Sequence, residues 1–128
     1  MAVVYAAALR TTRMGDVVTA IDAGAGAGKI ILYTSGDVEV ATLTLNDPCG
    51  TVSGDVLTID NDPVVSDASA TGGVAAKATI VTSADAVVVS GLTVGVGTGN
   101  IQVNSTTIAA GATVSLTGTN TLTHNTAG

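Results

Sequence analysis

Two kinds of hydrophobic periodicity follow one another along the chain. The first lies within residues 9–23, where apolar side chains recur at the spacing of an α-helix and most polar side chains fall on the other side. This pattern predicts one amphipathic helix over residues 9–23, with a capping side chain from Thr11 or Thr12 at its start and Gly24 just past its end. Gly15 weakens such a helix by about 1 kcal/mol relative to Ala, so packing must supply most of its stability.

Residues 1–8, which precede the predicted helix, contain more large apolar side chains than a free terminus should expose. We therefore expect residues 1–8 to form an apolar arm that packs on a neighbouring subunit or on another protein. The predicted partner interface consists of Val3, Val4, Tyr5 and Leu9.

After residue 28 the period changes to two, which is typical of β-strands. Residues 29–34 and 38–45 are rich in Ile, Val and Thr and are separated by a short turn sequence at residues 35–37, so they predict a β-hairpin. Thr and Ala tolerate either face of a sheet, and the facing of these strands is therefore only weakly specified.

Further short runs of the same composition follow with turn residues between them. They lie at residues 55–60, 75–83, 86–94, 101–103, 106–108, 113–116 and 121–124. The gaps are too short for crossover helices, which favours antiparallel pairing. About eight strands after one helix predict a mainly β protein, an antiparallel β-sandwich or jelly-roll-like domain over residues 9–128 with one short N-terminal helix.

Composition narrows the range of functions. The chain has 20 Ala, 19 Val, 21 Thr and 16 Gly among 128 residues, no Trp or Phe, and two Tyr. Only 4 Lys+Arg face 10 Asp+Glu, and the net charge of −6 disfavours a nucleic-acid partner. Because the large side chains of binding hot spots are nearly absent, a protein interface here must depend on area and repetition.

The single cysteine, Cys49, excludes an internal disulfide, and no apolar stretch approaches the roughly 20 residues that cross a bilayer. The first apolar run has no basic residue before it and two arginines after it, which is the wrong charge order for a secretory signal. We expect a soluble protein that is made and folds in the cytoplasm, with no membrane partner.

Two motifs that suggest chemistry fail on detail. The glycine-rich residues 24–29 lack the spacing of a phosphate loop, have Ile30 where Ser or Thr should follow the lysine, and come after a helix instead of a strand. His124, the only histidine, lies among polar residues near the end of the sequence and lacks the positioned partners of a catalytic base.

Two further candidates also favour a structural role. Cys49 has no His or Lys near it in sequence to activate the thiol. Asp60, Asn61 and Asp62 supply oxygen ligands but not the spacing of a calcium loop, and turn formation explains them. We expect no catalytic residues, no cofactor and no metal site, and hence a protein that is not an enzyme.

Three segments, residues 21–29 (IDAGAGAGK), 41–48 (ATLTLNDP) and 104–116 (NSTTIAAGATVSL), carry a resemblance to a protein family. The chain resembles small virion structural proteins of tailed bacteriophages, in particular head decoration (cement) proteins. The resemblance implies a homo-oligomer, dimer or trimer, on the outer capsid surface of the virion, which binds the major capsid protein and stabilises contacts between its subunits. The alternative that it leaves open is a tail or fibre component, for example a host-binding adhesin.

Overall fold

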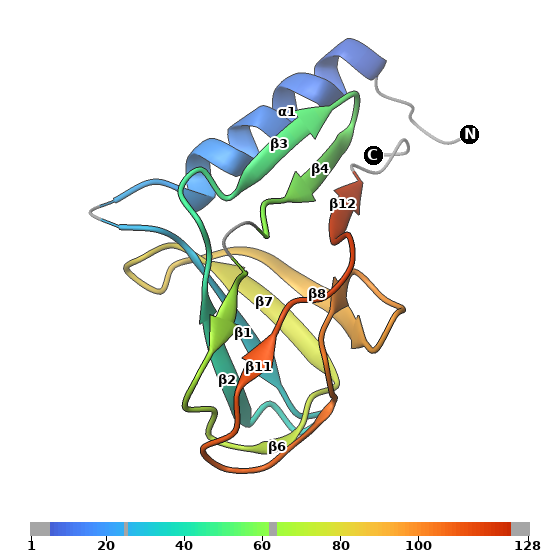
Figure 1. The fold of residues 1–128 in the computed structure, drawn as a ribbon. Helices are drawn as coiled ribbons and strands as arrows, with labels where there is room; N and C mark the ends of the chain where they lie inside the picture. The colour runs from blue at the N-terminus through green and yellow to red at the C-terminus, as the bar shows by residue number, and fades with distance from the viewer. Residues whose placement is uncertain (1–5, 25, 62–63, 124–128) are drawn as a thin grey trace.

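The protein is mainly β with one helix, as the computed structural model shows for residues 6–24, 26–61 and 64–123 (Figure 1). The largest sheet has five strands in the order β2-β1-β7-β8-β9. Their bounds are β1 (Lys29–Tyr33), β2 (Glu39–Thr44), β7 (Lys77–Val81), β8 (Val87–Gly95) and β9 (Ile101–Gln102). All neighbours in this sheet are antiparallel except β8 and β9, which are parallel.

The described residues also form three smaller sheets. A three-stranded sheet has the order β12-β4-β3, and two further strand pairs join β10 to β6 and β11 to β5. The bounds are β3 (Gly50–Ser53), β4 (Val56–Ile59), β5 (Ser66–Asp67), β6 (Gly73–Val74), β10 (Thr107–Ile108), β11 (Val114–Ser115) and β12 (Thr121–Thr123). The helix α1 (Ala7–Ile21) lies along β3 and β4 (Figure 1).

One hydrophobic core joins these sheets to the helix. The fully buried large side chains come from α1, from the five-stranded sheet, from β4 and the residue before β5, and from the segments near β9 and β11. They are Ile21, Ile30, Leu32, Val40, Leu43, Leu57, Val65, Ile80, Val81, Ile101, Val103 and Val114. Aliphatic side chains of medium size therefore fill the core.

The outer edge of β2 is covered by the chain that follows β4. The backbone N–H of Thr42 donates to Oδ2 of Asp67 at 3.0 Å, and the N–H of Gly72 donates to the carbonyl of Val40 at 3.1 Å. These bonds occupy edge groups that could otherwise pair with another chain.

The sequence predicted two antiparallel strand pairs correctly, but it did not predict every short strand or every strand pairing. The hairpin of β1 and β2 and the antiparallel pair of β7 and β8 are confirmed. The strands β3, β5 and β6 were not predicted, and the parallel pair of β8 and β9 departs from the expected antiparallel pattern. The mainly β class with one helix holds, with twelve strands in the described residues instead of about eight.

The helix begins and ends two residues earlier than predicted. The two predicted N-terminal caps are wrong, because Thr11 and Thr12 lie inside the helix and their hydroxyls donate to the carbonyls of Ala7 and Ala8. Ala6 occupies the N-cap position without a side-chain hydrogen bond. The helix therefore depends on tertiary contacts more than on its own terminus.

Candidate functional site

The predicted partner interface is only partly within the described residues. Val3, Val4 and Tyr5 lie outside them. Leu9 lies in the first turn of α1 and is 41% exposed. The three alanines before it, residues 6–8, are exposed as well. The start of the helix thus presents apolar surface to solvent.

The helix that carries this surface is fixed to the rest of the fold near both ends. Near its start, Nε of Arg10 lies 2.9 Å from Oδ2 of Asp55, the residue before β4, and both side chains are largely buried. Just past its end, the carboxylate of Asp22 accepts a hydrogen bond from the backbone N–H of Cys49 at 3.1 Å. Polar contacts therefore hold α1 against the three-stranded sheet and the residue before β3, at separate points along the helix.

Cys49 is a buried thiol and not an activated nucleophile. Its residue surface is 1% exposed. Burial, together with the negative charge of Asp22 and a hydrogen bond to it, raises the pKa of the Cys49 thiol from about 9 to about 12. Because the thiolate is the reactive form, this environment opposes nucleophilic chemistry at neutral pH.

In the acidic segment that begins at Asp60, the described side chain of Asn61 forms hydrogen bonds within the fold. The side-chain amide of Asn61 donates to the carbonyl of Leu116 at 3.1 Å and accepts from the N–H of Val65 at 2.7 Å. Asp62 and also His124 lie outside the described residues. Over residues 6–24, 26–61 and 64–123, no group of three His, Cys, Asp or Glu side chains is placed to hold a metal ion.

The glycine-rich segment before β1 has a packing role. A Cβ on Gly28 would lie 2.6 Å from Cγ2 of Ile21 and 2.8 Å from the carbonyl oxygen of Val81, so only glycine fits there. Lys29, the residue that a phosphate loop would require, forms an ion pair with Asp85 at 2.6 Å. Close packing thus accounts for the glycine at position 28, and Lys29 is engaged in charge pairing.

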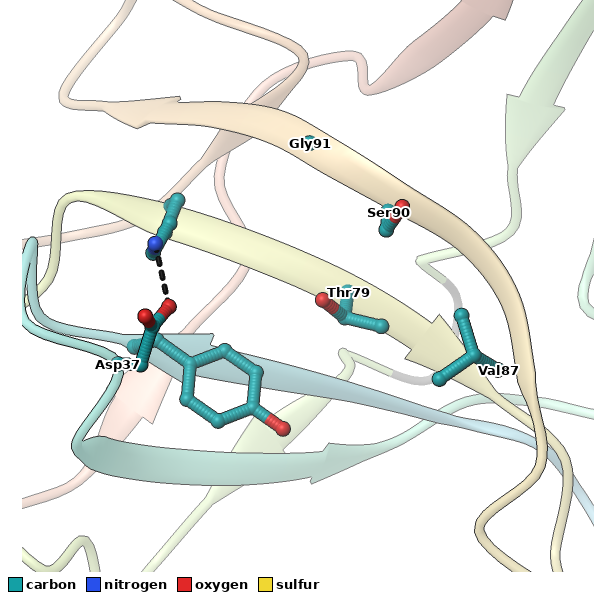
Figure 2. A pocket seen from close by; sticks show the side chains of 7 residues that line it. Asp37, Thr79, Val87, Ser90 and Gly91 are labelled. Carbon is teal, nitrogen blue, oxygen red and sulfur yellow. Dashed lines mark ion pairs between the residues drawn. The ribbon is translucent and has the colours of Figure 1, made fainter.

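A hollow of about 420 Å³ lies on the outer face of the five-stranded sheet, over β1, β7 and β8 (Figure 2). Its lining combines one tyrosine, an ion pair, two residues with aliphatic hydroxyls, a valine and a glycine. These residues are Tyr33, Asp37, Lys77, Thr79, Val87, Ser90 and Gly91. Asp37 lies at one end of the hollow and Val87 at the other, with Thr79 and Ser90 between them (Figure 2).

A β-bulge shapes this hollow. The register pairs Ala78 with Leu92 and Ile80 with Val89, so Thr79 alone on β7 faces two residues, Ser90 and Gly91, on β8. Gly91 has a φ of +72°, and no atom lies within 4 Å of where its Cβ would be. Such a bulge bends its strand and changes the direction of the side chains beside it.

No site at this hollow was predicted from the sequence. The signal was present, because a Ser-Gly pair in the interior of the β-branched run at residues 86–94 is typical of a bulge. The lining side chains from β1 and β7 could not be assigned to the same site from the sequence. Their position beside the bulge depends on the order of the strands, which the sequence does not reveal.

Comparisons with protein-family models, with curated proteins and with solved structures found no match. Within the described part of the chain, no helix combines the length and the apolar character that a membrane crossing requires.

Proposed function

We propose that this protein is a bacteriophage capsid decoration protein that binds the outer shell and stabilises contacts between major capsid subunits. The resemblance of its segments to decoration proteins supports the proposal. We also retain, as a finer proposal about the fold, that the curled five-stranded sheet and the small sheets form a sandwich-like or jelly-roll-like unit.

The observation that carries the proposal is the exposed apolar start of α1. Residues 6–8 are exposed alanines and Leu9 is 41% exposed, on a helix that is anchored by Arg10 and Asp22. An apolar surface held on a fixed helix can be buried against a partner without a large ordering cost. Val3, Val4 and Tyr5, the other residues of the interface predicted from the sequence, precede this segment in the chain and lie outside the described residues.

Repetition compensates for weak single contacts in such an assembly. The chain has few of the large side chains that dominate ordinary interfaces, and its most exposed valines are scattered over several elements. They are Val38, Val64, Val74, Val87 and Val96. A component bound in many copies at symmetric positions gains avidity from many modest contacts, and a dimer or trimer would repeat each of them.

Binding to shells that lack the protein tests the proposal. Leu9→Asp should reduce co-sedimentation with shells by about tenfold or more, because burying a charge against an apolar partner is costly. The matched control is Thr19→Asp, at an exposed position near the other end of the same helix, which should bind like the natural protein. Deleting residues 1–8 should leave a folded β domain that no longer decorates shells.

The copy number and the position on the particle distinguish this function from its alternative. Mass spectrometry of purified virions should find the protein in hundreds of copies, and antibody labelling should mark the head. A few copies confined to the tail would favour the tail or fibre component. Normal shell binding by both Leu9→Asp and the 1–8 deletion would contradict the interface.

The oligomeric state has its own test. We expect the melting temperature to rise with protein concentration, and to rise further when shells are added, because association stabilises the folded state. Analytical ultracentrifugation should show a dimer or trimer at micromolar concentration. A monomer whose melting temperature does not change on dilution would contradict the homo-oligomer.

A further inference from the structure

We propose that the hollow over β1, β7 and β8 is a binding site for a neutral carbohydrate. This inference concerns a different face from the start of α1 and requires neither a shell nor a protein partner. Its volume of about 420 Å³ lies within the range of about 300–1,000 Å³ that is usual for small-molecule sites.

The charges of the lining select a neutral ligand. Lys77 and Asp37 form an ion pair with each other, and the remaining lining residues carry no charge at neutral pH. The hollow therefore has no net charge that would attract a phosphate, a carboxylate or a metal ion. The paired ammonium and carboxylate nevertheless keep unused donor and acceptor positions, because Lys has three N–H groups and a carboxylate has several lone pairs.

The remaining groups fit the two kinds of surface on a sugar ring. The hydroxyls of Thr79 and Ser90 can each donate and accept, which suits ligand hydroxyls. Tyr33 and Val87 supply apolar surface for the C–H face of the ring, and the Tyr ring adds a polar hydroxyl of its own. A purely apolar ligand would displace water from these polar groups without replacing its hydrogen bonds.

The position of the hollow on a sheet face disfavours an extended peptide. A peptide that adds to a sheet binds at an edge, where backbone N–H and C=O groups are free. Over the hollow, β7 is paired on both sides, with β1 and with β8, so side chains are what the central strand offers a ligand. The bulge at Ser90 and Gly91 supplies the opening between these side chains.

Amide NMR spectra of the full protein test the site directly. Maltotriose, lactose, cellobiose and chitobiose are each titrated to 20 mM, and we expect at least one to bind with a Kd on the order of 1 mM. The shifted resonances should centre on Tyr33, Lys77, Thr79 and Ser90. If no sugar in this panel shifts these amides, or if the shifts centre elsewhere, the proposal is wrong.

Substitutions identify the contacts. Tyr33→Ala should weaken binding about tenfold, whereas Tyr33→Phe should retain most of it because the ring remains. Ser90→Ala should weaken binding severalfold. Its matched control is Ser53→Ala, another exposed strand serine that does not line the hollow, and this variant should bind normally. Binding that survives Tyr33→Ala unchanged in a folded protein would overturn the site, while leaving the proposed shell function untouched.

Discussion

The buried thiol of Cys49 should make the stability of the protein fall at alkaline pH. Its pKa is about 12 in the folded protein and about 9 when the thiol is exposed, because burial and the carboxylate of Asp22 oppose ionisation in the fold. A thiol that ionises more easily in the unfolded chain favours unfolding above the unfolded pKa. The contribution of Cys49 is therefore fully present below pH 9 and is lost progressively between pH 9 and pH 12.

The magnitude follows from the two pKa values. The difference between the two pKa values corresponds to about 4 kcal/mol of free energy of unfolding. The linkage relation gives a loss of about 2 kcal/mol of this free energy between pH 8 and pH 10.5. The control is Cys49→Ala, which removes the titrating group and keeps the backbone N–H that donates to Asp22. Losing the sulfur lowers stability at every pH, but only the difference in pH dependence between the two proteins reports the thiol.

Urea denaturation at several pH values measures this difference. Other groups that titrate at high pH, such as tyrosine and lysine, affect both proteins and cancel in the comparison. The free energy of unfolding of the natural protein should fall by about 2 kcal/mol more than that of Cys49→Ala between pH 8 and pH 10.5. Parallel losses in the two proteins would show that the folded environment does not oppose ionisation, and would refute the reasoning.

Three further predictions concern stability and are checked by the same denaturation experiments. Gly28→Ala should lower the free energy of unfolding by about 1–3 kcal/mol, because a Cβ has no room there. Gly15→Ala should stabilise the helix by about 0.5–1 kcal/mol, because no atom lies within 4 Å of where its Cβ would be. Equal effects of the two substitutions would contradict the packing argument. Arg10→Ala should cost about 1–2 kcal/mol by leaving the largely buried Asp55 carboxylate without its ion pair, and a neutral result would show that α1 is not held there. Asn120→Ala should cost about 1–3 kcal/mol, because this residue is 1% exposed and its side chain bonds two backbone groups; unchanged stability would mean that water replaces it.

The elements with strong local signals could be predicted from the sequence. The hairpin of β1 and β2 has two β-branched runs and a turn with Asp37 at a φ of +67°, and the pair of β7 and β8 has the same design with Asp85 at +66°. Both depend on neighbours in sequence, and turn composition reports such pairing well.

The elements that were missed depend on distant residues. The strands β5 and β6 are two residues long and exist because β11 and β10 pair with them, more than thirty positions later in the chain. The helix starts at Ala7 without a capping side chain, so no residue type in the sequence indicates where it begins. The hollow on the outer face of the five-stranded sheet likewise combines side chains from β1, β7, β8 and the turn at Asp37, and only the Ser90–Gly91 bulge could be recognised from the local sequence.

The pairing of β12 with β4 has a consequence for how the protein is made. α1 and β3 are synthesised early, yet β4 gains its second neighbour only when residues 121–123 become available. Such long-range pairing delays folding until distant parts of the chain meet. During translation, the edge of β4 that does not pair with β3 therefore stays unpaired until β12 has left the ribosome. Until that pairing forms, the unpaired edge of β4 can associate with other chains, which favours aggregation.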